Sequence, residues 1–528
     1  MIRLGHNVRT VLLPLNSIRN RKLFLIYTTT SINLFSTKVE SEKGNDVKKD
    51  SGSSRKSLSL VESISLWYDA MSHSNPMKVK QDELLTRALP GYYNTDKPNP
   101  SFPNLKATNN LIPIEDGDRN KGSVLNELRI ENCSAKSTIP NKEEIDDKTT
   151  NLVMVHGYGS SLGWYYKNFH GLIKDNENCR IFALDLLGFG LSSSQPLDVS
   201  SIDNDNSTKE FDIMYDHQSL THYELIHPPL KLPKEFEISL KEFKRYFENL
   251  DKNKQLIEAI ENRHIDAIES WRKANNLEDF TLMGHSFGGY ISLAYTLKYP
   301  ERVKKLILVS PGGVERNPYA ITNPIFEKNS PETVLIMNGT QSEVRFKPST
   351  TPEDYEFLGR LPLMPIWFRF FWSNHISVFR LLQLLGPLGL MKFSALAFKR
   401  FLRDKKNGLK GAYEETVLFT LYVFCTFKKY SFSDQSLMSL FTSTIVAKHP
   451  MLDRINKLQC KTIWIFGEFD FIYKNIGKVA MEQLNSRPET NGELPKAEYK
   501  IVSKAGHNLF LDNHKEFNDT VKRFIGWK

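Results

Sequence analysis

Three features that this 528-residue chain lacks limit the kind of protein that it can be. It has only four cysteines, with no CxxC pair and no Cys/His cluster, which argues against a disulfide framework or a structural metal. No apolar run reaches the roughly 18 residues that a membrane-spanning helix needs. The basic excess, 70 against 61 acidic residues, is small and gives no indication of nucleic-acid binding. No metal or organic cofactor is implied, and membrane contact is expected to be peripheral.

Acidic residues are also missing from the first 38 positions. Six basic residues lie between Arg3 and Lys38, serine and threonine are frequent, and the first acid is Glu40. This composition is typical of a mitochondrial transit peptide, the alternative being a basic tail without an address. We therefore predict a targeting leader over 1–38, a polar linker over 39–60, and a mitochondrial protein that lies peripherally on the inner membrane.

Short apolar runs alternate with helix-length segments along much of the chain. These runs are residues 151–155, 180–184, 280–283, 304–309, 462–466 and 498–502. Runs of this length that are apolar on both faces predict the buried strands of a mostly parallel sheet layered with helices. The sequence therefore predicts an α/β fold.

Two long segments interrupt this alternation. Residues 195–255 begin acidic and polar, which predicts a surface insertion with little packed core. Residues 316–450 become apolar and aromatic and are too long for a loop, so they predict an insertion followed by a mainly helical cap. The two parts of the core would then be 61–315 and 451–528.

The sharpest motif is Gly284-His285-Ser286-Phe287-Gly288, which follows the apolar run 280–283 and precedes a helical pattern. G-x-S-x-G between a strand and a helix is the nucleophile elbow, in which a tight turn presents a serine hydroxyl. Small residues are needed there because the strand and the helix pass close to the turn. Ser286 is therefore the candidate nucleophile.

A second glycine-containing turn, His156-Gly157-Tyr158-Gly159, follows the run 151–155. In this position it predicts an oxyanion loop, whose main-chain N–H groups stabilise charge on a carbonyl oxygen. The candidate donors are the backbone amides of Tyr158 and Phe287.

A serine hydroxyl becomes an effective nucleophile when a histidine, oriented by a carboxylate, accepts its proton. In this fold the acid and then the histidine follow the serine along the chain. Asp470 follows the run 462–466 and His507 follows the run 498–502, so they are the candidate acid and base. Glu468 remains an alternative to Asp470.

With these motifs, the chain resembles an α/β-hydrolase subfamily that includes animal N-acyl-phospholipid lipases, a lipase coactivator and fungal mitochondrial cardiolipin deacylases. The resemblance covers 145–195 and 256–528. Beyond the elbow, it rests on the segments 268–272 (IESWR), 448–452 (KHPML) and 507–512 (HNLFLD). It implies an α/β-hydrolase fold with the helical cap inserted before the strand that carries the acid.

The same resemblance implies a function. Because Ser286 is kept, the first hypothesis is a phospholipid acyl hydrolase of the cardiolipin-deacylase type, which releases a fatty acid and a lysophospholipid. A lysophosphatidate acyltransferase is the alternative, and a non-catalytic lipid-binding protein or coactivator is the rival of another class. The subfamily associates the His-x4-Asp pattern ending at Asp512 with acyl transfer, but His507 is already the candidate base.

The predicted cap has its own charge pattern. Between Glu356 and Asp404 there are seven basic residues and no acid, interleaved with aromatic side chains. Aromatic and basic residues together suit the surface of an anionic membrane, although packed aromatics beside solvated cations would give the same pattern. The candidate substrate or membrane contacts are Arg369, Arg380, Lys399, Arg400, Trp367 and Trp372.

Overall fold

The computed structural model describes residues 57–95, 97, 99–115, 122–132, 149–202, 210, 213–214, 236–339, 342–346, 366–373, 376–401, 409–426, 431–487 and 496–528. The predicted leader 1–38 and most of the linker 39–60 lie outside these residues.

One large sheet organises the fold, with strand order β1-β2-β4-β3-β7-β8-β10-β11. Its strands are β1 (Leu105–Pro113), β2 (Val124–Asn132), β3 (Thr150–Val155), β4 (Cys179–Leu184), β7 (Phe280–His285), β8 (Val303–Val309), β10 (Lys461–Gly467) and β11 (Ala497–Val502). A small antiparallel sheet contains β5 (Ile213–Met214), β6 (Phe236–Ser239) and β9 (Glu343–Phe346).

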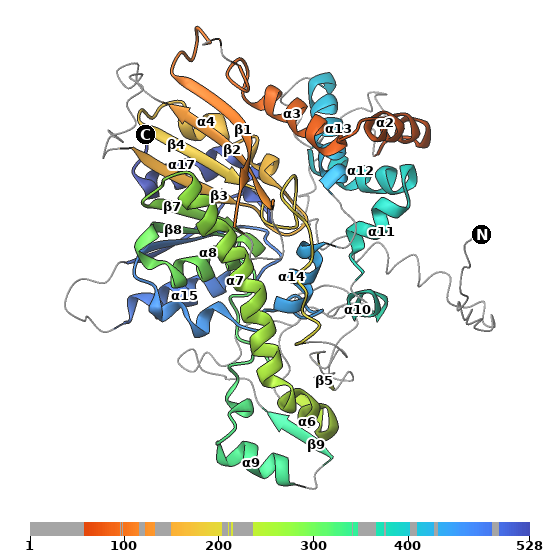
Figure 1. The fold of residues 1–528 in the computed structure, drawn as a ribbon, viewed down its shortest axis with the longest axis vertical. Coiled ribbons are helices and arrows are strands. Elements are labelled where there is room, and N and C mark those ends of the chain that lie inside the picture. The colour runs from red at the N-terminus through yellow and green to blue at the C-terminus, as the bar shows by residue number, and fades with distance from the viewer. Residues whose placement is uncertain are drawn as a thin grey trace, which may run out of the picture.

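Helices surround the large sheet (Figure 1). Those before the cap region are α2 (Leu60–Ser72), α3 (Pro76–Ala88), α4 (Phe169–Ile173), α6 (Leu240–Glu248), α7 (Leu250–Ala274) and α8 (Phe287–Lys298). Those between β8 and β10 are α9 (Pro331–Asn338), α10 (Ile366–Ser373), α11 (Val378–Leu384), α12 (Pro387–Phe401), α13 (Leu409–Thr426) and α14 (Phe432–Leu440). The last ones are α15 (Asn475–Asn485), α16 (Leu509–Asp512) and α17 (His514–Ile525).

The α/β prediction is confirmed, because all six apolar runs form strands and these six pair in parallel. The sequence did not reveal β1 and β2, which pair antiparallel to each other and extend the sheet beyond β4. β1 reads LKATNNLIP and is largely half-exposed, so it lacks the continuous apolar run of a central strand.

Alternating side chains of the strands build two cores, one on each face of the sheet. Val153 and Val155 of β3 point into a core formed with α7, α8 and α15. Leu152 and Met154 point into the other core, which is formed with α4 and α17. Both sheet faces are therefore covered, and α7 and α8 cross in front of the sheet in Figure 1.

The predicted insertion 195–255 packs more than its polar start suggested. Its described end forms β6, α6 and the beginning of α7, and Phe243, Tyr246 and Leu250 are buried in the first of these cores. The amphipathic spacing of α6 places its buried aromatic residues on one face. Residues 215–235 lie outside the described part of the chain.

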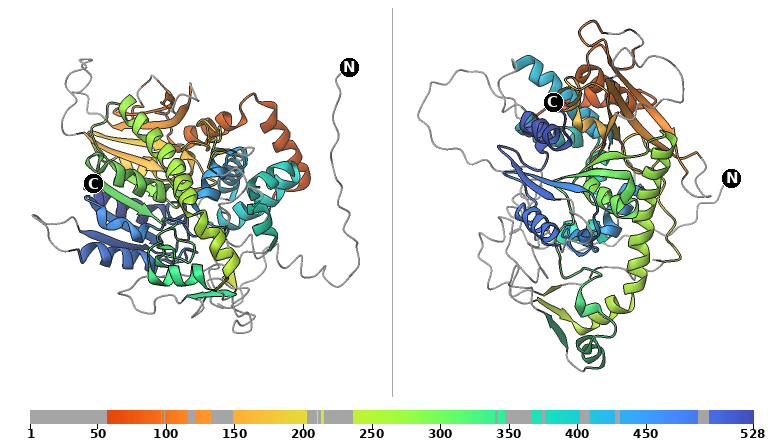
Figure 2. Two further views of the ribbon diagram at one scale, coloured as in Figure 1. Left: turned by 60° about the horizontal axis from the view of Figure 1, so that its bottom comes forward. Right: turned by 90° about the vertical axis from the view of Figure 1, so that its left-hand side faces the viewer.

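The described parts of 316–450 are mainly helical. α12 packs on α2 and α13 packs on α3, so this segment meets the N-terminal helices at one end of the molecule (Figures 1 and 2). In the described ranges, no helix combines the length and apolar character that crossing a bilayer requires.

Candidate active site

The turn between β7 and α8 holds Ser286 in a strained backbone conformation, with φ 51° and ψ −117°. A positive φ is uncommon for a residue with a side chain and is concentrated at functional turns. The Ser286 amide donates to the Val309 carbonyl of β8 at 2.9 Å, and the Ser286 carbonyl accepts from the amides of Gly289 and Tyr290. The neighbouring strand and the first turn of α8 thus hold the serine in place.

The glycines of the elbow are required by close packing. A Cβ on Gly284 would lie 2.4 Å from the Gly288 carbonyl oxygen, and a Cβ on Gly288 would lie 2.3 Å from the His156 carbonyl oxygen. Because backbone atoms cannot move aside as a side chain can, no larger residue fits at either position. This is the physical reason for the G-x-S-x-G pattern.

His507 lies between Ser286 and Asp470. Its Nε2 is 3.0 Å from the Ser286 Oγ and its Nδ1 is 3.0 Å from the Asp470 Oδ1. A carboxylate can only accept, so Nδ1 carries a proton and, in a neutral ring, Nε2 is free to accept the serine proton. The structure therefore brings together the three residues that the sequence singled out, in the order of a proton relay.

The Asp470 carboxylate is fully buried, and hydrogen bonds from protein groups stabilise its charge. Oδ1 also accepts from the Ile472 amide at 3.0 Å, and Oδ2 accepts from the Ser310 hydroxyl. Burial alone would raise the pKa of Asp470, but the charge of His507 and these hydrogen bonds lower it below its ordinary value. The acid therefore stays ionised at neutral pH.

Glu468, the alternative acid, points elsewhere. Its Oε2 accepts from the Lys504 amide at 2.8 Å, which ties the loop after β11 to the loop after β10. Of these two carboxylates, Asp470 is the one that contacts His507.

Two further residues, which no sequence motif singled out for this role, support the relay. Ser310, directly after β8, contacts Asp470 and has a positive φ of 42°. The His285 Nε2 lies 3.0 Å from the His507 carbonyl oxygen, and since a carbonyl only accepts, His285 is the donor. His285 stood inside the elbow motif, but its contact depends on a loop more than 200 residues away.

The predicted oxyanion loop lies directly against the nucleophile. A Cβ on Gly157 would be 3.0 Å from the Ser286 Cβ and 2.8 Å from the His285 Nδ1. The Phe287 amide begins α8, so it has no acceptor within the helix. Both chain segments that were expected to supply the oxyanion donors meet at Ser286, and the roles of the Tyr158 and Phe287 amides stay a prediction.

The side chain of Tyr158 ties this loop to the helices between β8 and β10. Its hydroxyl donates to the Asp434 Oδ1 of α14 at 2.6 Å, and its oxygen accepts from the Ser377 hydroxyl before α11 at 3.2 Å. Burial, with the Asp434 charge added, raises the pKa of Tyr158 well above its ordinary value, and burial also raises the pKa of Asp434. Asp434 carried no recognisable sequence motif.

Asp512, the last residue of the His-x4-Asp pattern, contacts main chain. Its Oδ2 accepts from the Gly506 amide at 2.9 Å, immediately before His507 in the chain. This hydrogen bond holds the loop that presents the base.

The predicted lipid-contact residues fall into two groups. The side chains of Trp367, Arg369 and Arg400 lie outside the described part of the structure. Arg380 is half-buried and Lys399 is exposed.

Trp372 is buried, with 8% of its surface exposed, and its ring lies 5.7 Å from that of Phe368. In this conformation it packs against neighbouring side chains, and its contact with a membrane surface stays a prediction. An aromatic side chain in a mixed apolar and basic segment can pack in the protein interior as well as contact a membrane interface.

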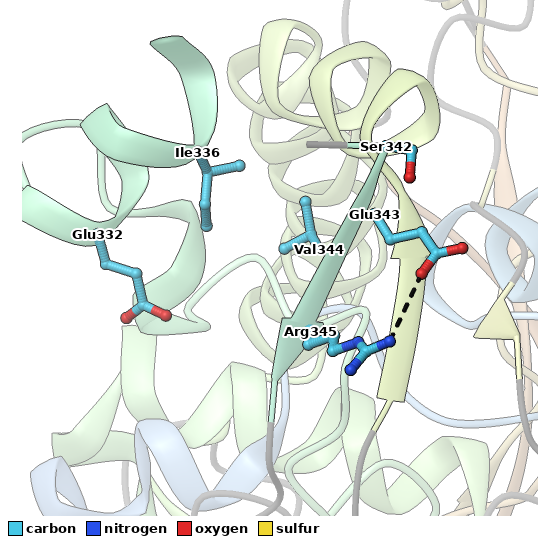
Figure 3. A pocket seen from close by; sticks show the side chains of 6 residues that line it. All are labelled: Glu332, Ile336, Ser342, Glu343, Val344 and Arg345. Atoms are coloured by element: carbon cyan, nitrogen blue, oxygen red, sulfur yellow. Dashed lines mark ion pairs between the residues drawn. The ribbon is translucent and has the colours of Figure 1, made fainter. Parts of the chain in front are cut away.

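A separate open groove lies between α9 and β9, at the bottom of the molecule in Figure 1. Figure 3 shows its lining residues, which are Glu332, Ile336, Ser342, Glu343, Val344 and Arg345, with an ion pair between Glu343 and Arg345. None of them belongs to the Ser286 site.

A family model described as the alpha/beta hydrolase fold matches residues 150–341, which include the oxyanion loop and the elbow. This match agrees with the parallel sheet and its flanking helices. The chain has the α/β-hydrolase fold. Most of the cap region and the acid and histidine loops lie after the matched segment in the chain.

Three curated relatives are similar to this chain. Protein ECM18 of Saccharomyces cerevisiae is 28% identical over 71% of this chain and 71% of its own length. The 1-acylglycerol-3-phosphate O-acyltransferase ICT1 of the same yeast is 29% identical over 71% of this chain and 82% of its own. The mouse 1-acylglycerol-3-phosphate O-acyltransferase ABHD5 is 25% identical over 75% of this chain and 82% of its own. These relatives confirm the resemblance to the lipase and acyltransferase subfamily.

Proposed function

We propose that this α/β-hydrolase is a serine-dependent phospholipid acyl hydrolase of the cardiolipin-deacylase type. The observation that carries the proposal is the continuous hydrogen-bonded chain from Ser286 through His507 to Asp470. A serine in a strained elbow, a histidine within 3.0 Å and a buried carboxylate behind it form the constellation that activates a hydroxyl for attack on an ester.

In the first half of the reaction, the Ser286 Oγ attacks the acyl carbonyl carbon while the His507 Nε2 accepts the hydroxyl proton. The Tyr158 and Phe287 amides stabilise the negative oxygen of the tetrahedral intermediate. The ester C–O bond then breaks, and the departing lysophospholipid oxygen takes the proton from His507. Asp470 stabilises the imidazolium throughout.

In the second half, His507 takes a proton from water, and the resulting hydroxide attacks the acyl-Ser286 carbonyl. The acyl–Oγ bond breaks, Ser286 recovers the proton from His507, and a fatty acid is released. No group outside the chain and its substrates is needed to balance these steps.

Acyl transfer to lysophosphatidate is the second candidate, favoured by the names of two of the relatives. It would use the same acyl-Ser286 intermediate, with the lysolipid hydroxyl in place of water. Asp512 would support either reaction through the loop of His507. Product analysis with and without added lysophosphatidate separates the two, because only transfer converts the acceptor into a diacyl product.

A non-catalytic lipid-binding protein or coactivator is the rival of another class. It would keep Ser286 without using it, so it would not react with a fluorophosphonate probe, whereas an activated serine does.

We expect the enzyme to prefer anionic phospholipid, with cardiolipin as the leading substrate. The support is the seven-cation, acid-free stretch between Glu356 and Asp404, because each cation near an anionic surface contributes about 1 kcal/mol. Vesicle hydrolysis should therefore be faster for cardiolipin than for phosphatidylcholine. Neutralising Arg369, Arg380, Lys399 and Arg400 together should reduce cardiolipin turnover at physiological salt.

A matched variant for this comparison is the neutralisation of Lys304, an exposed lysine of β8 that pairs with Asp279. Equal hydrolysis of phosphatidylcholine and cardiolipin by the wild type would refute the selectivity. So would unchanged cardiolipin turnover in the fourfold variant.

We also infer a mitochondrial location from the basic, acid-free start of the sequence. Deleting residues 1–38 should leave the catalytic activity intact and stop import, because the six basic residues of the leader are removed. An in vitro import assay measures this, with wild-type protein and dissipated membrane potential as controls. Normal import of the shortened chain would refute the location signal.

A further inference from the structure

Large apolar side chains gather on one part of the surface. Among the described residues, seven of the thirteen exposed large apolar side chains lie on α2 or at the turn between α11 and α12. We call these seven residues the α2–turn surface: Leu60, Val61, Ile64, Tyr68, Leu384, Leu385 and Leu388. Contiguous apolar patches are uncommon on soluble proteins and mark sites of interaction.

The contribution of α2 follows from its orientation. Its exposed apolar residues occur at positions 60, 61, 64 and 68, which share one side of a helix, while Ser63 and Ala70 are buried on another side. A capping box between Ser59 and Glu62 fixes the start of the helix. A surface helix normally exposes polar residues to solvent, whereas this well-capped helix exposes apolar ones.

The turn continues the same surface. Gly386, with φ 54°, brings the chain against α2, because a Cβ at this position would lie 3.8 Å from the ring of Trp67. The Leu58 amide donates to the Ser394 Oγ of α12 at 3.0 Å, which joins the two helices again. Figures 1 and 2 show α2 and α12 side by side from several directions.

Charge around this surface favours an anionic partner. α11 and α12 contain no acid, and Lys392 and Lys399 of α12 are exposed. Of the acids of α2, Glu62 caps its own helix by accepting from the Ser59 amide at 2.9 Å, and Asp69 lies 3.7 Å from the Lys80 Nζ. Apolar residues beside exposed lysines match the interface of a bilayer, where acyl chains lie beneath anionic headgroups.

α11 links this surface to the candidate active site. At its start, the Phe379 ring lies 5.7 Å from the Tyr158 ring of the oxyanion loop. At its end, Leu384 is 73% exposed. Seven helical residues span about 10 Å, so a lipid at the surface lies within about one acyl-chain length of the oxyanion loop.

We propose that the α2–turn surface docks the protein on a phospholipid bilayer that carries anionic headgroups. The seven apolar residues enter the interface, Lys392 and Lys399 contact the headgroups, and α11 brings the active site to the membrane. The inference rests on the proposed function only in that the bilayer supplies the substrate. Other occupants, a second copy of this chain or a protein partner, are outcomes of the test below.

The test is flotation of the full-length chain with phosphatidylcholine vesicles that contain cardiolipin. Two double variants are compared with the wild type, Leu384→Ser/Leu385→Ser at the turn and Val61→Ser/Tyr68→Ser on α2. The matched control is Leu335→Ser on α9, because Leu335 is as exposed as Leu384, at 73%, but lies at a distant part of the molecule (Figure 1). Each double variant should lose binding on the order of tenfold or more, and the control should bind as the wild type does.

Hydrolysis of a dispersed short-chain ester separates this proposal from the proposed function. Both double variants should keep wild-type turnover of the soluble ester, because their changes are on the surface. Failure of the wild type to cleave any ester would refute the function without touching the flotation result. If both double variants bound vesicles as the wild type does, the docking proposal would be overturned. It would also be overturned if the double variants changed from oligomer to monomer while their vesicle binding stayed unaltered.

Discussion

Ser286→Ala and His507→Ala should each lower kcat by a factor on the order of 10⁶ while leaving the fold intact. The reason is that the nucleophile and its base act as one unit. Removing either one ends the proton transfer across the 3.0 Å contact between the His507 Nε2 and the Ser286 Oγ. The double variant should be little slower than either single variant, which steady-state kinetics on a phospholipid substrate will show.

Ser292→Ala is the matched control for the serine change. Ser292 lies on α8, the same helix that follows the elbow, and its buried hydroxyl has no hydrogen-bond partner among the described residues. Its removal should leave kcat within a few-fold of the wild type. Purified Ser286→Ala that retained substantial activity would contradict the mechanism.

Asp470→Asn should lower kcat by about 10⁴, the scale seen when the acid of such a triad becomes an amide. The amide nitrogen favours the wrong tautomer of His507, because it can donate to Nδ1, and the remaining Nε2–H then faces the serine without accepting its proton. The change keeps the size of the side chain, so circular dichroism and thermal unfolding should still show a folded protein.

Glu468→Gln supplies the comparison for Asp470→Asn. Glu468 contacts the Lys504 amide and not His507, so its neutralisation should change kcat by a few-fold at most. A collapse of activity in Glu468→Gln with activity kept in Asp470→Asn would assign the acid to Glu468.

Much of the fold and of the relay could be predicted because the signals are local. A buried parallel strand carries a short apolar run, and each catalytic residue follows such a strand within a few positions. Ser286, Asp470 and His507 therefore come together at one edge of the sheet, since the carboxyl ends of parallel strands meet there. The glycines of the elbow indicate the same site, because the close packing there leaves no room for a side chain.

The parts that were missed depend on contacts between distant segments. β1 is half-exposed and polar, and only its pairing with β2 makes it part of the sheet. His285 and Ser310 support the relay through partners on other loops, and no motif around them indicates this. Trp372 is buried, and the sequence could not indicate this, because a pattern that suits a membrane interface also suits a packed interior.

The most direct test of the central claim is labelling by a fluorophosphonate, followed by mass spectrometry of the digested protein. Because the claim is an activated Ser286, the wild type should gain one adduct on the peptide that contains this residue. Ser286→Ala should gain none, His507→Ala should react far more slowly, and Ser292→Ala should label as the wild type does. A folded wild-type protein that stays unlabelled, or an adduct on another residue, would contradict the account.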